Sequence, residues 1–76
     1  MKLPRVTADQ VIRVLEKLDF GLARSRGAHL IYRSPEGQRV TVPYHAGKTI
    51  HPKTFKSILR DAGLSVEEFA KLLKGK

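Results

Sequence analysis

Apolar residues near the start of the chain recur at the spacing of a helix. Four of them fall at i, i+3, i+4 and i+7, which predicts a single apolar stripe on a helix whose other side is charged. The stripe consists of Val11, Val14, Leu15 and Leu18. Thr7 and Gln10 have the spacing of a capping box, and they set the predicted start of this helix.

The pattern then changes to alternation, and we expect strands over residues 20–25, 29–34 and 39–44. In the second strand Leu30 and Tyr32 share one face, while His29, Ile31 and Arg33 share the other. The sequence SPEG at residues 34–37 is typical of a type I turn followed by a bulge. A turn of this kind pairs Arg33 with Arg39, which sets the register of the hairpin.

Two helices complete the predicted order. Pro52 suits the first turn of a helix whose apolar stripe is closed by Gly63, and Ser65 with Glu68 forms a second capping box before a short last helix. The two stripes are Phe55, Ile58, Leu59 and Ala62, then Phe69, Leu72 and Leu73. We therefore predict one domain over residues 1–76: an α+β two-layer sandwich, with an order of elements that resembles the double-stranded RNA-binding domain.

Composition narrows the class of protein. The 76 residues are 41% hydrophobic and include no cysteine, so stability must come from packing, without disulfides or thiolate metal sites. No apolar run is long enough for a transmembrane helix or a secretory leader. We expect a cytoplasmic protein that does not enter a membrane.

Charge points to a polyanionic partner. The chain has fifteen Lys and Arg residues and seven Asp and Glu residues, which gives a net charge of +8. Between residues 20 and 60 the single acid is Glu36, against eight basic residues: Arg24, Arg26, Arg33, Arg39, Lys48, Lys53, Lys56 and Arg60. Their spread does not follow an amphipathic helix, which disfavours a lipid surface and favours nucleic acid. A merely solvated basic surface is the alternative.

Two basic pairs carry a local electrostatic cost. The predicted register sets Arg33 beside Arg39, and either Glu36 or a bound phosphate can relieve their repulsion. Lys53 and Lys56 fall near the start of a predicted helix, where positive charge opposes the helix dipole and a bound anion would compensate. We expect these residues, with Arg24, Arg26 and Lys48, to contact RNA.

The residue with the clearest chemical potential is His29. It should face away from the core beside several arginines, where a neutral imidazole can move a proton at the ribose 2′-OH or at the 5′-oxygen that leaves. Gly27 nearby permits close approach of a ligand backbone, although it equally permits a tight turn. His29, His45 and His51 have no acid or cysteine at a metal-site spacing, so we expect neither a metal nor a cofactor.

Taken together, the motifs resemble the HicA family of toxins from toxin–antitoxin systems. The resemblance covers about residues 8–69 and rests on RGAHLIY, VTVP, the HAGK loop and the AGLS ending. It implies a fold like the double-stranded RNA-binding domain, an mRNA interferase activity, His29 as the catalytic residue, and a HicB-type antitoxin as partner. Ala28 departs from the serine or glycine that often precedes the family's histidine.

Some questions stay open in the sequence. Cleavage of RNA needs both an acid and a base, and Tyr44, His45 or a water molecule can supply the group that His29 does not. One alternative function is an RNA-binding module without chemistry, in which His29 only contacts RNA. Another is a regulatory protein that binds DNA together with an antitoxin-like partner.

Overall fold

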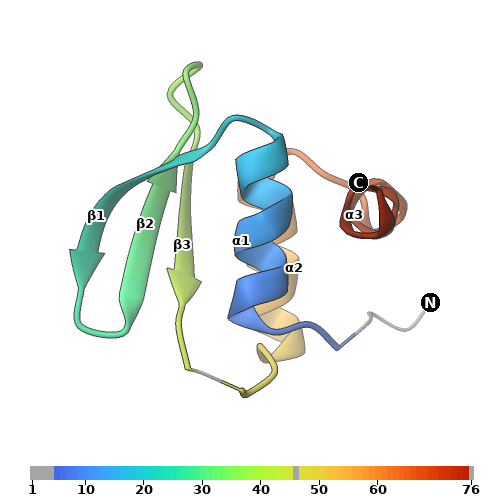
Figure 1. Cartoon of the computed structure of the whole chain (residues 1–76), viewed down its shortest axis with the longest axis horizontal. Coiled ribbons are helices and arrows are strands. Elements are labelled where there is room, and N and C mark those ends of the chain that lie inside the picture. The colour runs from blue at the N-terminus through green and yellow to red at the C-terminus, as the bar shows by residue number, and fades with distance from the viewer. Residues whose placement is uncertain (1–4, 46, 76) are drawn as a thin grey trace.

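The computed structural model describes residues 5–45 and 47–75 and confirms the predicted order of elements (Figure 1). One helix precedes three antiparallel strands, and two further helices follow, which makes an α+β fold. The elements are α1 (Ala8–Lys17), β1 (Gly21–Arg26), β2 (His29–Arg33), β3 (Arg39–Pro43), α2 (Pro52–Ala62) and α3 (Val66–Lys74). Strands β2 and β3 each end one residue earlier than predicted.

The strands lie in the order β1-β2-β3, and the predicted register of the second hairpin is confirmed. Arg33 pairs with Arg39, and the pairs behind them continue the same ladder. The Gly37 N–H donates to the Ser34 carbonyl at 3.0 Å, and the φ of Gly37 is +91°. This is the predicted type I turn with a glycine bulge, so turn chemistry and alternation agree on one register.

The first helix begins as predicted but ends in a way that the sequence pattern did not reveal. Thr7 and Gln10 form the expected capping box. At the other end Asp19 has a φ of +67°, and the Phe20 N–H donates to the Leu15 carbonyl at 2.9 Å. This pairing is that of a Schellman motif, with aspartate in the left-handed position usually held by glycine. Phe20 is therefore buried at the helix end, and its prediction as the first strand residue is wrong.

Helices α1 and α2 pack on one side of the sheet, mainly against β3, and α3 packs against α1 (Figure 1). Phe55 of α2 and Phe69 of α3 meet edge to face, with ring centroids 4.9 Å apart. All six residues of β1 are exposed, so the helices cover less of the sheet than the pattern suggested. On the opposite side of the sheet, which we call the outer face, none of the helices in the described residues packs (Figure 1).

Alternation along the strands divides core from surface. Tyr32, Val40 and Val42 are buried beneath the helices, which confirms the predicted core position of Tyr32. Tyr44 is only half-buried and lies at the rim of the core. Within the described residues, no helix is both long and apolar enough to cross a membrane.

Candidate nucleic-acid interface

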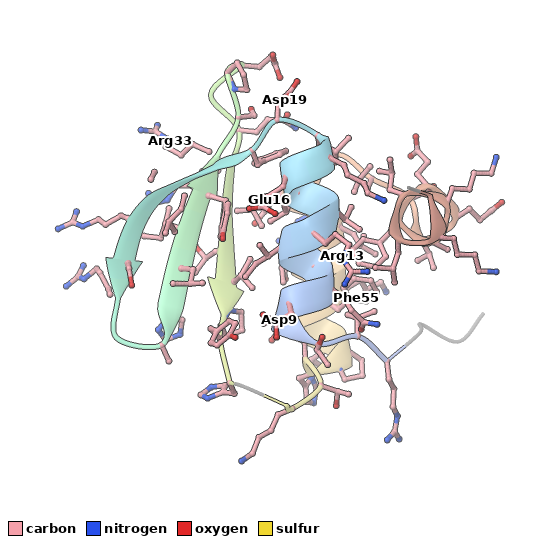
Figure 2. All side chains as sticks on the ribbon, in the orientation of Figure 1. Asp9, Arg13, Glu16, Asp19, Arg33 and Phe55 are labelled. Atoms are coloured by element: carbon pink, nitrogen blue, oxygen red, sulfur yellow. The ribbon has the colours of Figure 1, made fainter. Side chains whose placement is uncertain are left out.

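His29 opens β2 and lies exposed on the outer face. It pairs with Arg26 of β1 on one side and with Pro43 of β3 on the other. Because the neighbouring inward positions Leu30 and Tyr32 pack toward the helices, alternation sends the side chain of His29 the other way. The outer face also carries Arg33, whose side chain points away from the helices in Figure 2.

A β-bulge in β1 determines which arginines share this face with His29, and the sequence analysis missed it. Leu22 pairs with Tyr32 and Arg24 pairs with Ile31, which leaves Ala23 as an extra residue. Strict alternation would have placed Leu22, Arg24 and Arg26 on one face. The bulge instead lets Leu22 lie on the helix side while both arginines lie on the outer face. The period-2 pattern carries no signal for such an insertion.

Gly27 forms the tight turn that leads into His29. Arg26 and His29 are paired, so Gly27 and Ala28 make a two-residue hairpin loop, and the φ of Gly27 is +56°. A glycine at the first position of this loop is what a type II′ turn requires. A Cβ atom at Gly27 would meet nothing within 4 Å. The turn alone accounts for the glycine, and the space beside it is open to a ligand.

The paired arginines on the outer face have no acidic neighbour to offset them. Arg33 and Arg39 are direct cross-strand partners. In the described part of the chain the single salt bridge joins Arg60 and Asp61, at 3.9 Å on α2. Glu36 therefore forms no salt bridge with either arginine, and the binding of an anion between them stays a prediction.

Tyr44 lies on the other side of the sheet from His29. Its N–H donates to the Ala28 carbonyl at 2.6 Å, which extends the β2–β3 ladder by one step and places Tyr44 on the helix side. A hydrogen bond to Asp9 of α1, together with the negative charge of that carboxylate, raises the pKa of Tyr44. Because Tyr44 and His29 lie on opposite sides of the sheet, Tyr44 is disfavoured as the proton-transfer partner of His29.

The predicted lysines lie apart from the outer face. Lys48 is exposed in the loop between β3 and α2, where its N–H donates to the His45 carbonyl at 3.0 Å. Lys53 and Lys56 lie on the exposed side of α2, in the helix layer. With Ser57 and Arg60 they surround a shallow depression of about 490 Å³. The predicted RNA-binding residues therefore form two surfaces, one on the outer face of the sheet and one on α2. Lys48 lies in the loop that connects β3 to α2.

His51 has a structural role at the start of α2. It is the N-cap of α2, and its Nδ1 accepts a hydrogen bond from the Lys53 N–H at 3.1 Å. Across residues 5–45 and 47–75, no three His, Asp or Glu side chains are grouped as metal ligands would be. Of the three histidines, His29 is the one that the strands place on the outer face.

Comparison with known protein families gives a match over most of the chain. The family model described as HicA toxin of bacterial toxin–antitoxin matches residues 8–64, which is more than half of the chain. No curated protein matches the sequence. The matched region runs from the start of α1 to the residue after Gly63, and so includes the whole sheet and α2. The chain belongs to the HicA family of toxins from bacterial toxin–antitoxin systems.

Proposed function

We propose that this toxin is a metal-independent endoribonuclease that cleaves mRNA, with His29 as its general acid or base. The observation that carries the proposal is the position of His29: an exposed imidazole on the outer face, directly across the strands from Arg26 and in line with Arg33. Fold alone would not suggest chemistry, because the element order is shared with domains that only bind RNA.

The reaction that suits these groups is an internal transfer at phosphorus. The ribose 2′-oxygen attacks the adjacent phosphorus, the bond from phosphorus to the 5′-oxygen breaks, and the products are a 2′,3′-cyclic phosphate and a free 5′-hydroxyl. A neutral His29 takes the proton from the 2′-OH, or its protonated form gives one to the leaving oxygen, with a contribution of roughly 10²–10⁴-fold. Arginines on the outer face would stabilise charge that develops on the phosphate.

The second proton-transfer group in this proposal is a water molecule or His45. Tyr44 lies on the helix side of the sheet, and Asp9 raises its pKa, so little of the phenolate that could act as a base is present. His45 is exposed in the loop that follows β3. Lys48, Lys53 and Lys56 would bind phosphates of the same RNA beyond the cleaved linkage, and the space beside Gly27 would admit its backbone.

The family places the chain beside an antitoxin, and we propose that this partner is of the HicB type and acts in the cytoplasm. A partner that covers the outer face would exclude RNA from His29. Its contacts with Arg24, Arg26, Arg33 and Arg39 would favour an acidic surface on the antitoxin.

The test is cleavage of a long single-stranded RNA in the presence of EDTA. We expect wild type to cut, His29→Ala to cut roughly 10²–10⁴ times more slowly, and the matched variant His51→Ala, which changes the cap of α2 and not the outer face, to stay within a few fold of wild type. Circular dichroism and RNA affinity, measured on all three proteins, show that each is folded and binds. Equal cleavage by wild type and His29→Ala would refute the assignment, and binding without any cleavage would identify a non-catalytic RNA-binding module.

A further inference from the structure

A shallow pocket of about 240 Å³ lies on the outer face, and all three strands contribute to it. Its lining residues are Ala23, Arg24, Ile31, Arg33 and Arg39. Drug-sized ligands occupy pockets of about 300–1,000 Å³, so this pocket suits something smaller, of the size of a single nucleotide fragment. The pocket is close to His29, because its lining residue Ile31 lies two residues after His29 in β2 and on the same face of the sheet.

Two of the five residues that line the pocket, Ala23 and Ile31, are apolar, and we call them its floor. A basic surface that meets only solvent does not require such residues. The bulge brings Ala23 and Arg24 together opposite Ile31, so a small residue and a half-buried aliphatic residue lie next to each other. On the opposite side of the sheet the exposed apolar residue is Leu22, which is 55% exposed and lies outside the pocket. The flat side of a base can pack against the apolar side chains of the floor and remove them from water.

The rim of the pocket is cationic on every strand. Arg24, Arg33 and Arg39 come from β1, β2 and β3 respectively, and no acidic residue lines the pocket. Guanidinium groups bind phosphate through paired hydrogen bonds and also stack on flat π-systems. An apolar floor inside a ring of guanidinium groups therefore matches both parts of a nucleotide, its base and its phosphate.

We propose that this pocket is a nucleotide subsite, which holds one unpaired base of the RNA against Ile31 and its phosphate between Arg33 and Arg39. A nucleotide held there directs the neighbouring linkage toward His29. Because the base must leave its stack to reach Ile31, the subsite selects RNA that is single-stranded beside the cleaved bond. This inference rests on the proposed function, since it assigns part of the substrate to the same face.

Equilibrium binding tests the subsite separately from catalysis. A fluorescently labelled single-stranded RNA and a duplex of the same sequence are titrated, in EDTA, with His29→Ala protein that also carries Ile31→Ser or the matched change Leu22→Ser. We expect Ile31→Ser to weaken binding of the single strand about five- to tenfold, because serine removes apolar surface against which the base packs, and to change duplex binding less than about twofold. Leu22→Ser should change neither.

A second pair of variants keeps the test valid if Ile31→Ser does not fold. The variants are Arg24→Gln, in the rim of the pocket, and Arg60→Gln, on α2. Both arginines are exposed. We expect Arg24→Gln to lower the preference for single-stranded over duplex RNA, and Arg60→Gln to leave that preference unchanged. Equal effects of pocket and control variants, or equal affinity for both RNAs, would overturn the subsite. Cleavage that is absent in wild type, with this binding pattern intact, would overturn the ribonuclease assignment alone.

Discussion

At the scale of single residues, the outer face contains a pair of like charges that lowers the stability of the fold. Arg33 and Arg39 lie directly opposite each other across β2 and β3, and the described structure gives them no acidic partner. Like charges in this position are destabilising by some tenths of a kcal/mol. Sequence positions that weaken the fold in this way are typical of functional surfaces, where binding and not folding requires the residue.

Replacing one member of that pair should therefore raise stability and lower binding together. We expect Arg39→Gln to increase the free energy of unfolding by about 0.2–1 kcal/mol, because the repulsion with Arg33 is lost, and to weaken RNA binding. Urea denaturation and RNA titration of the same preparations measure the two effects. Arg60→Gln is the control, because Arg60 neighbours Asp61 on α2. A loss of stability in Arg39→Gln would show that the arginine pair is structural.

At the scale of elements, much of the fold could be read from local sequence. Both capping boxes, the stripe of each helix and the SPEG turn appear in the structure where the pattern placed them. These features depend on neighbours within one turn of chain, so their signals are local. The bulge at Ala23 and the left-handed Asp19 were not predicted. A bulge requires no particular residue, and aspartate adopts the left-handed region only occasionally, so neither position carries a local signal.

The candidate site, too, was predicted from the sequence only in part. Alternation alone placed His29 on the side away from the core, and the hairpin register placed Arg33 beside Arg39. The side taken by Arg24 and Arg26 depends on the bulge, and the separation of Lys53 and Lys56 from the outer face depends on how α2 packs. The bulge and the packing of α2 are features of the folded structure, and the periodicity of a single sequence does not predict them.

The start of α2 offers a test of a local interaction. His51 caps the helix by accepting from the Lys53 N–H, so we expect His51→Ala to lower the free energy of unfolding by about 0.5–2 kcal/mol. His51→Asp should recover most of that loss, because an aspartate accepts the same hydrogen bond and favours the positive end of the helix. Thermal denaturation measures both variants. If Asp and Ala were equally destabilising, His51 would stabilise the loop by other contacts.

The start of α3 should respond to pH. Hydrogen bonds from the backbone and side chain of Ser65 lower the pKa of Glu68 below its usual value of 4.5. A carboxylate whose pKa is lower in the folded chain stabilises the fold above the usual pKa, and this contribution disappears as the pH falls through the lowered pKa. We therefore expect Glu68→Gln to lose less stability than wild type on acidification below 4.5.

Urea denaturation at neutral and acidic pH measures this difference. Glu67→Gln, which changes the neighbouring residue in the same helical turn, is the matched control. If both variants followed the wild-type acid dependence, the hydrogen bonds of Glu68 to the cap would not contribute to the pH dependence of the fold.

At the scale of the whole molecule, packing the helices on one side of the sheet leaves the other side available. Helices α1 and α2 cover β3 from one side, α3 packs behind α1, and the outer face keeps its histidine and arginines in solvent (Figure 1). The second basic surface, on α2, belongs to the other layer. An RNA strand long enough to meet both would pass around the β3 edge, near Lys48 in the loop that joins the two layers.

The net charge of +8 ensures attraction to any nucleic acid, so affinity alone does not identify the substrate. What separates a ribonuclease of this type from a binding module, or from a DNA-binding protein, is use of the ribose 2′-OH. That group is the nucleophile in the proposed reaction, and it is also what distinguishes RNA from DNA chemically.

The most direct measurement is therefore cleavage, in EDTA, of an RNA oligonucleotide and of the same oligonucleotide with 2′-deoxyribose at the cleaved nucleotide, with the product ends identified by mass spectrometry. We predict that wild type cuts the all-ribose strand to a 2′,3′-cyclic phosphate and a 5′-hydroxyl, and leaves the 2′-deoxy linkage intact. Cleavage of both strands at the same linkage, or products that carry a 5′-phosphate, would contradict a histidine-driven transfer at the 2′-OH.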